Sequence, residues 1–198
     1  MKSLFFGGIH PADRKELSAN AELKPVNTPK QVTIAMSQHI GNPCTPLVKV
    51  GDYVKKGQKV GDGEGLCVPV HATVSGKVVA IEPRRHCVVG DLVPFIVIEN
   101  DGLDTPCTDL APLTEEQLKD PEAIIQRIRE AGVVGMGGAM FPTHFKIQGG
   151  RGKVDTLIIN GAECEPYLNG DHRTMLEHPV ELLKGIELVR IAQGVDTA

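Results

Sequence analysis

Two neighbouring stretches decide the fold of the amino-terminal half: GDYVKKGQKVG at residues 51–61 and VHATVSGKV at residues 70–78. In both stretches glycines separate short apolar runs, a pattern typical of tight turns between strands. Strands are predicted at residues 31–36, 47–50, 76–81 and 92–99, with glycine turns between them. Many short strands with regular turns predict a small β-sandwich or barrel across residues 31–100.

This region resembles the biotinyl and lipoyl carrier domains, which have a barrel-sandwich hybrid fold. In those domains a lysine that carries the cofactor lies eleven residues before the glycine that matches Gly76. Here Gly65 occupies that position, so no lysine is available for acylation. We therefore expect a carrier-like fold that serves as a scaffold and not as a swinging arm.

Composition narrows the class of protein. The chain has 198 residues, with 21 Lys and Arg against 25 Asp and Glu, and a formal net charge of −4. This balance lacks the basic footprint of a nucleic-acid-binding protein. The longest apolar run, at residues 92–98, is far shorter than a membrane span.

The cysteines and histidines show no spacing typical of metal ligands. No two of the five cysteines form a CxxC pair, so neither a zinc ribbon nor a ferredoxin-type cluster is predicted. Reduced thiols in a cytoplasmic protein are the expected state. The seven histidines are expected in turns or at the surface, and no metal site is predicted.

The chain is predicted to have four parts. Residues 1–30 are an extended arm, residues 31–100 the β domain, residues 101–113 a linker, and residues 114–198 the incomplete start of an α/β domain. In the last part helices are expected from Pro121 and from Pro179, where proline stands at the first helical position. A buried strand is expected at residues 154–159, and a further strand is expected to begin near residue 195.

Two loops of the last part have the composition of ligand-binding loops. The first, GMGGAMFPTHFK at residues 135–146, contains three glycines that let a backbone approach a phosphate closely, and ends on Lys146. It is neither a GxGxxG nor a Walker sequence, and spacing alone leaves a glycine turn without a ligand equally open. The second, NGAECEPY at residues 160–167, follows the expected strand, where α/β folds place ligands.

Together these loops resemble a known family. Gly-x-Gly-Gly-Ala-x-Phe-Pro-Thr-x-x-Lys, followed by Asn-x-x-Glu-x-Glu-Pro, is similar to the flavoprotein subunit of respiratory complex I that binds FMN and NADH. The chain resembles the RnfC family, whose members belong to Rnf electron transport complexes, more fully. There Gly-Gly-Ile-His-Pro at residues 7–11 and Gln-His-Ile-Gly at residues 38–41 also recur. The four blocks recur in one order, and the resemblance covers nearly the whole chain.

The resemblance implies binding roles for eight residues. Those implied to line FMN are Gly135, Gly137, Lys146, Asn160 and Glu163. Those implied to face NADH are Gly138, Phe141 and Glu165. In this assignment Lys146 lies near the FMN phosphate and Phe141 stacks on the adenine of NADH. No catalytic side chain is implied, because the flavin carries the chemistry.

The implied function is that of an oxidoreductase subunit. The intact subunit would exchange electrons between NAD(H) and FMN and relay them through iron–sulfur clusters towards ferredoxin and membrane partners. The clusters would lie in a carboxyl-terminal part that this chain lacks, so the chain alone is expected to be inactive. Its implied place is at the cytoplasmic face of the cell membrane, beside the other subunits of an ion-translocating Rnf complex.

Three alternatives remain open at this point. Met136, Ala162 and Cys164 differ from the complex I pattern, and Met140 replaces a glycine usual in both families. These departures leave room for a non-catalytic assembly scaffold. A cobalamin reductase with an RnfC-like region is a second alternative. The third is the component of the sodium-pumping NADH-quinone reductase that shares the amino-terminal barrel, which the intact glycine loop disfavours.

Overall fold

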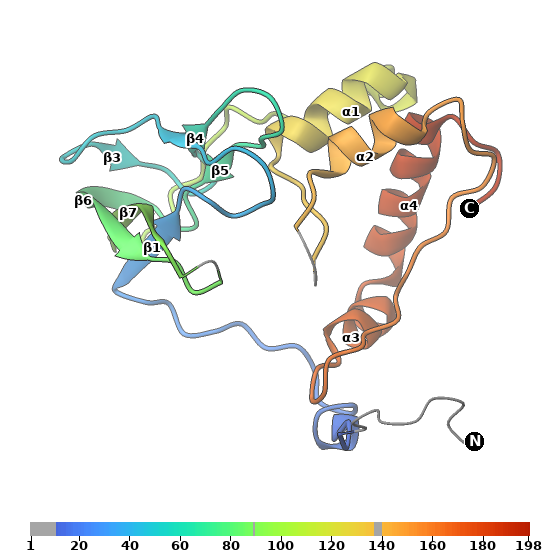
Figure 1. Ribbon diagram of the computed structural model, residues 1–198, viewed down its shortest axis with the longest axis horizontal. Helices are drawn as coiled ribbons and strands as arrows, with labels where there is room; N and C mark the ends of the chain where they lie inside the picture. The colour runs from blue at the N-terminus through green and yellow to red at the C-terminus, as the bar shows by residue number, and fades with distance from the viewer. Residues whose placement is uncertain (1–10, 89, 137–139) are drawn as a thin grey trace. The chain divides into compact units, whose positions relative to one another are not determined.

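The computed structural model describes residues 11–88, 90–136 and 140–198 (Figure 1). The chain divides into two compact units. The large unit comprises residues 27–157 and 188–197, and the small unit comprises residues 1–26, 158–187 and 198.

Seven strands of the large unit form two antiparallel sheets (Figure 1). The strands are β1 (Gln31–Ala35), β2 (Thr45–Pro46), β3 (Tyr53–Val54), β4 (Lys59–Asp62), β5 (Val70–His71), β6 (Gly76–Arg85) and β7 (Leu92–Asn100). One sheet has the order β1-β7-β6-β3 and the other β2-β4-β5. Strand side chains that point inward are buried, as Ile34, Val78 and Ile96 show. The predicted barrel-sandwich fold of this region is confirmed.

The strand expected at residues 47–50 is absent. Asp52 forms a turn here: its carboxylate accepts from the Lys49 amide at 3.0 Å, and its own amide donates to the Lys49 carbonyl at 3.1 Å. Leu47 and Val50 are exposed as a result. The neighbouring strand is β2, which is only two residues long. The turn chemistry of Asp52 therefore overrides the apolar run.

Gly76 fixes the start of β6 against β7. Its φ is +151°, and a Cβ at this position would lie 1.9 Å from the carbonyl oxygen of Glu99. Only a glycine permits so close an approach of two backbones. Gly76 pairs with Asn100 in β7 and with Val54 in β3, so one residue joins three strands.

Helices of the large unit enclose a second apolar core. The helices are η2 (Gln117–Lys119), α1 (Pro121–Glu130), α2 (Thr143–Gly150) and the final residues of α4 (Pro179–Gln193). The buried members of this core are Ile124, Ile125, Ile147 and Ala192. Both predicted helix starts are confirmed, and Asp120 caps α1 by accepting from the Glu122 amide at 3.0 Å.

The buried strand predicted at residues 154–159 is wrong. Only Thr156 pairs in this segment, through an isolated parallel bridge to Thr197, and the Leu157 amide donates to the Thr197 carbonyl at 3.0 Å. Val154 and Ile159 are about half exposed. The segment has strand composition but too few partner strands among the described residues to become a ladder. The parallel sense of the bridge agrees with an α/β arrangement.

The small unit joins the amino-terminal segment to the loop before α3 (Figure 1). Its elements are η1 (Lys15–Leu17), α3 (Gly170–Glu177) and the first part of α4. The Arg173 guanidinium donates to the Ala19 carbonyl and pairs with Glu177, whose carboxylate accepts from the Leu23 amide. The expected extended arm is thus tied to α3 by hydrogen bonds.

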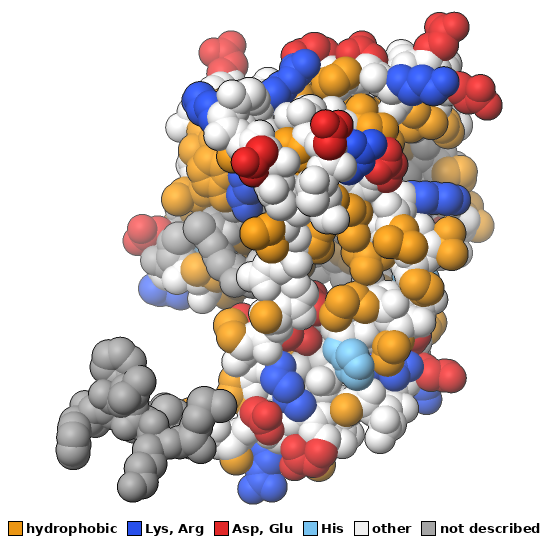
Figure 2. Space-filling view, turned by 90° about the vertical axis from the view of Figure 1, so that its right-hand side faces the viewer, with side chains coloured by type: hydrophobic (Ala, Val, Ile, Leu, Met, Phe, Trp, Pro, Cys, Tyr) orange, Lys and Arg blue, Asp and Glu red, His pale blue; other side chains and the backbone are white. Residues whose placement is uncertain are grey.

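The surface mixes apolar and charged side chains. Figure 2 shows hydrophobic side chains on one face of the molecule, with acidic and basic ones scattered among them. In α3 and α4 the exposed apolar residues include Leu176, Val180 and Leu183. Among the described residues, no helix is both long enough and apolar enough to cross a bilayer.

Candidate functional site

A short antiparallel bridge closes the glycine-rich loop of the large unit. Val134 pairs with Pro142, and two amides complete the closure. The Gly135 amide donates to the Phe141 carbonyl at 3.0 Å, and the Thr143 amide donates to the Val133 carbonyl at 3.1 Å. These bonds bring Gly135 and Phe141 together at the base of the loop. Gly137 and Gly138 lie outside the described residues.

Lys146 lies over the same base. It sits in the first turn of α2, and its Nζ would be 3.9 Å from a Cβ built on Gly135. The amino end of α2 carries no side-chain cap. A helix amino end attracts anions through its amide groups and dipole. An exposed ammonium, a glycine and a helix end without a side-chain cap therefore lie close together, at a place suited to a phosphate.

Met140 adopts a backbone conformation that favours glycine. Its φ is +50°, in the left-handed region, which costs a non-glycine residue roughly 1–2 kcal/mol. The resemblance implies a glycine at this position, and a glycine would adopt this φ without strain. The departure noted in the sequence thus marks a strained residue beside the candidate site.

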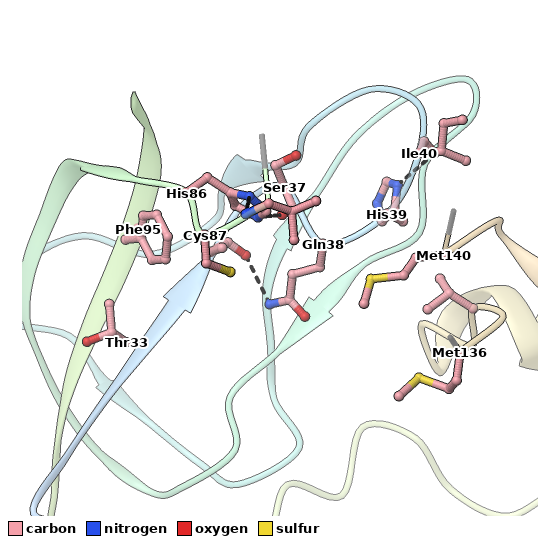
Figure 3. Close-up of a pocket in the computed structure, with 13 residues that line it drawn as sticks. Thr33, Ser37, Gln38, His39, Ile40, His86, Cys87, Phe95, Met136 and Met140 are labelled. Atoms are coloured by element: carbon pink, nitrogen blue, oxygen red, sulfur yellow. Dashed lines mark hydrogen bonds between the residues drawn. The ribbon is translucent and has the colours of Figure 1, made fainter. Parts of the chain in front are cut away.

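The glycine loop borders a pocket of about 660 Å³ in the large unit (Figure 3). Met136 and Met140 lie at one end, and Thr33 and Phe95 lie at the other. Between them the loop after β1 contributes residues 37–40, and the turn between β6 and β7 contributes residues 86–88. The β domain therefore supplies most of the wall that faces the glycine loop. Sequence reasoning missed this wall, because nothing in the β strands signals a ligand.

An ion-pair network holds α1, and with it the glycine loop, against the β domain. Lys59 pairs with Asp62 at 3.0 Å and with Glu130 at 2.5 Å. Arg129 pairs with Asp62 at 3.1 Å and with Glu130 at 2.6 Å. Burial opposes ionisation of both carboxyl groups, but the hydrogen bonds and cations outweigh it. The pKa values of Asp62 and Glu130 therefore lie below their usual range.

Gly132 directs the chain from α1 into the glycine loop. Its φ is +70°, and a Cβ here would lie 2.5 Å from the Pro69 carbonyl oxygen. His71 packs beside it, and burial lowers the pKa of the His71 imidazole. The end of α1 is therefore pressed directly onto the loop before β5.

His144 corrects the expectation that all seven histidines occupy turns or the surface. It lies in α2 and is 4 % exposed. Burial, together with the nearby charge of Arg129, lowers the pKa of its imidazole. His144 therefore packs in the interior, where burial favours its neutral form. Its Nδ1 has no hydrogen-bond partner within the part of the chain that the structure describes.

The second predicted loop, residues 160–167, belongs to the small unit. The Asn160 Oδ1 accepts from the Ala162 amide at 2.9 Å, which makes a local turn. The Glu163 carboxylate accepts from the Gly170 and Asp171 amides at 3.0 and 3.3 Å. Glu163 therefore binds the amino end of α3, as a carboxylate does at the positive end of a helix. Glu165 is half-buried in the same loop.

The amino-terminal segment fastens this second loop. The Lys15 ammonium donates to the Glu163 carbonyl at 2.6 Å and to the Leu168 carbonyl at 2.9 Å. The Tyr167 amide donates to the Asp13 carbonyl at 2.7 Å. Sequence reasoning missed Lys15, because a lone lysine in an apparently extended arm carries no signal of the loop that it will bind.

The structure thus groups three of the predicted residues, Gly135, Phe141 and Lys146, in the large unit. The other three described residues, Asn160, Glu163 and Glu165, share one loop of the small unit.

Comparisons with known proteins identify two domains in the chain. Residues 3–103 match the RnfC barrel sandwich hybrid domain, and residues 128–198 match the Nuo51 FMN-binding domain. The chain is 48 % identical over 194 residues to a protein of Acetobacterium woodii, which is named as the C component of a Na⁺-translocating ferredoxin:NAD⁺ oxidoreductase complex. It is 40 % identical over 200 residues to the proton-translocating counterpart of Clostridium ljungdahlii.

The alignments cover nearly all of this chain but only part of each relative. The two alignments span 97 % and 100 % of this chain but 44 % of each relative. A third relative is the C component of the ion-translocating oxidoreductase complex of Serratia proteamaculans. It is 42 % identical over 187 residues, which is 94 % of this chain and 26 % of that protein. The chain thus spans less than half the length of these relatives.

The two matched domains define the class: proteins that join a barrel-sandwich hybrid domain to an FMN-binding domain. Within that class, the chain belongs to the RnfC family. Its relatives are subunits of oxidoreductase complexes, as their names state.

Proposed function

We propose that the chain forms the amino-terminal part of an electron-transport subunit that holds FMN and passes electrons between NAD(H) and the rest of an Rnf-type complex. The observation that carries this proposal is the convergence of Gly135, Lys146 and the uncapped end of α2 at the base of the glycine loop. The match of residues 128–198 to an FMN-binding domain supports it.

The eight residues are proposed to keep the roles that the resemblance implies. Lys146 would neutralise the phosphate of FMN, and Gly135 and Gly137 would let the backbone approach it. Gly138, Phe141 and Glu165 would face NADH, while Asn160 and Glu163 would lie beside the flavin. FMN, when bound, supplies the capacity to accept a hydride and to release single electrons. The chain's own residues bind the flavin and orient it.

We also propose the surroundings of this subunit. Electrons would continue to iron–sulfur clusters outside this chain, with ferredoxin reached through further subunits, at the cytoplasmic face of the membrane. The chain alone would lack activity. The names of the relatives, which mention ferredoxin, NAD⁺ and ion translocation, support the proposal.

A domain division follows as a further part of the proposal. Residues 1–30 would be the arm, 31–100 the barrel-sandwich domain, 101–113 the linker, and 114–198 the start of the FMN-binding domain. The two family matches, over residues 3–103 and 128–198, support a boundary between them.

The test is an FMN titration of the intact subunit, followed by NADH under anaerobic conditions. We expect saturable quenching of flavin fluorescence and bleaching of the flavin by NADH. Lys146→Ala should weaken FMN binding about tenfold, equivalent to ~1.4 kcal/mol. Lys153→Ala removes another exposed lysine from the same unit and should leave binding unchanged. An intact subunit that binds no FMN would contradict the proposal and favour an assembly scaffold.

A further inference from the structure

The β domain contains a buried cluster of sulfur and nitrogen atoms that the flavin chemistry does not use. His39 and Cys44 come from the loop between β1 and β2, and Cys67 comes from the loop between β4 and β5. Their exposed fractions are 8 %, 4 % and 0 %. Cys44 Sγ lies 3.5 Å from Cys67 Sγ, and His39 Nε2 lies 4.0 Å from Cys44 Sγ and 3.7 Å from Cys67 Sγ.

A fourth donor atom completes the cluster. The carbonyl oxygen of Val68 lies 3.1 Å from Cys44 Sγ, 3.7 Å from Cys67 Sγ and 3.2 Å from His39 Nε2. All six separations among the four atoms therefore fall between 3.1 and 4.0 Å. For any four points in one plane, the ratio of the longest to the shortest separation is at least that of a square's diagonal to its side. The ratio of the longest to the shortest separation found here is smaller than that. The four atoms must form a tetrahedron.

The size of this tetrahedron fits a zinc ion. Its edges average about 3.5 Å, which places the centre about 2.2 Å from each corner. Zn–S bonds are about 2.3 Å and Zn–N and Zn–O bonds about 2.0–2.2 Å in proteins. Thiolate and imidazole ligands select zinc over magnesium or calcium, which prefer oxygen. We propose that His39, Cys44, Cys67 and the Val68 carbonyl form a structural Zn²⁺ site.

Outer contacts orient the histidine as a zinc ligand requires. His39 Nδ1 lies 3.1 Å from its neighbour's carbonyl, that of Ile40. When Nδ1–H donates to that oxygen, Nε2 carries the lone pair of the ring. The Val68 amide donates to this nitrogen at 3.3 Å. Zinc-bound histidines almost always make such a second hydrogen bond to a carbonyl or carboxylate. The side chain of His39 also lines the pocket, so one edge of the site borders that space (Figure 3).

The two loops that supply the ligands are also joined by their backbones. The Asn42 amide donates to the Leu66 carbonyl at 2.9 Å, and the Asn42 side chain donates to the Glu64 carbonyl at 3.0 Å. At Gly41 a Cβ would lie 2.1 Å from the Leu66 carbonyl oxygen, so the loops approach as closely as backbones can. The ligand positions are therefore held before an ion binds.

Burial disfavours a reactive role for the two thiols. Cys44 is 4 % exposed and Cys67 is 0 % exposed. Nucleophilic cysteines instead have exposed sulfurs. The cluster thus fits a structural metal site, which would link the loop before β2 to the loop before β5.

The test is a Co²⁺ titration of the full chain in metal-free, reducing buffer, followed by displacement with Zn²⁺. We expect one equivalent of Co²⁺ to produce sulfur-to-cobalt charge-transfer absorption, and Zn²⁺ to abolish it. The double variant C44S/C67S should lose this absorption and bind Zn²⁺ at least about 100-fold more weakly. The matched double variant C87S/C164S removes two exposed cysteines and should behave as the wild type. Identical Co²⁺ spectra in the two double variants would overturn the proposal.

A second measurement needs no variant to fold. The wild-type chain is alkylated with and without Zn²⁺, and each cysteine is followed by mass spectrometry. We expect Zn²⁺ to slow the alkylation of Cys44 and Cys67 at least tenfold and to leave Cys87 and Cys164 unchanged. Equal rates with and without Zn²⁺, or a disulfide that joins Cys44 to Cys67 in protein kept from oxidants, would overturn the proposal.

Discussion

The β domain and the glycine loop use the left-handed region of the backbone in opposite ways. In the β domain, Gly76 takes a positive φ at a place where two backbones touch, and no side chain fits. In the glycine loop, Met140 takes a positive φ although it has a side chain. The difference shows that the β domain is fixed by backbone packing, whereas the loop carries a conformational cost at a candidate binding site.

The largest expected effect comes from Gly76→Ala. The new Cβ would lie 1.9 Å from the Glu99 carbonyl oxygen, so β6 and β7 would have to separate. We expect a loss of about 3 kcal/mol or more in the free energy of unfolding, measured by urea titration. Gly102→Ala is the control, because it also has a positive φ but no atom within 4 Å of its Cβ. It should cost only about 1 kcal/mol. Equal losses would show that φ alone, and not the close approach, fixes this turn.

Acid should loosen the ion-pair network that seats α1 on the β domain. The pKa values of Asp62 and Glu130 are lower in the folded protein than in the unfolded chain. The unfolded chain therefore binds more protons as the pH falls below about 5, and stability declines there. Asp62→Asn should cost roughly 2 kcal/mol at neutral pH, because it leaves Lys59 and Arg129 short of a partner.

The check is the urea midpoint of wild type and Asp62→Asn between pH 7 and about pH 3.5. The wild type should lose stability more steeply with acid than the variant does. Asp109→Asn, at an exposed carboxyl group in the linker, serves as the control and should keep the wild-type slope. Parallel slopes for wild type and Asp62→Asn would show that Asp62 adds nothing to the acid sensitivity.

In the small unit, Lys15→Ala should free the loop that carries Asn160, Glu163 and Glu165. The variant loses hydrogen bonds from the ammonium to two carbonyl groups, worth about 1 kcal/mol in a half-buried setting. We expect roughly fivefold faster amide hydrogen exchange at residues 163–169. Lys24→Ala, at an exposed lysine of the same segment, should leave the rates unchanged. Unchanged rates in Lys15→Ala would mean that the segment does not hold the loop.

The smallest expected effect is a gain of stability from Met140→Gly. The change removes the left-handed strain from the folded state. Glycine also gives the unfolded chain more backbone entropy, which offsets part of that benefit. The net gain in the free energy of unfolding should be about 0.5–1 kcal/mol. Met136→Gly is the control, because Met136 is exposed and adopts no positive φ; it should be neutral or destabilising. A loss of stability in Met140→Gly, measured by the same urea titration, would show that the Met140 side chain contributes more than its backbone costs.

The sequence predicted the elements whose signals are local. Short apolar runs between glycine turns predicted the strands at residues 31–36 and 76–81, and Pro121 predicted a helix start, because each signal depends on neighbouring residues. The prediction of a strand at residues 154–159 was wrong because a strand also depends on distant segments. Their composition is that of a strand, but a strand also needs partners, and the described part of the chain offers this segment one bridge.

The residues of the candidate site also divide into those with a local sequence signal and those that distant segments bring together. The glycines and Lys146 were found because they lie close together in the sequence. Lys15, the β-domain wall of the pocket, and the cluster of His39, Cys44 and Cys67 were missed, because distant segments assemble them. The replacement of a usual glycine by Met140 was the one local clue to strain.

The central claim is that Lys146 and the base of the glycine loop bind the phosphate of FMN. The most direct measurement compares the affinities of the intact subunit for FMN and for riboflavin, which lacks the phosphate, in wild type and in Lys146→Ala. We expect that the wild type prefers FMN and that Lys146→Ala loses about tenfold of this preference while its riboflavin affinity stays the same. An equal loss of affinity for both ligands, or an unchanged preference for FMN, would contradict it.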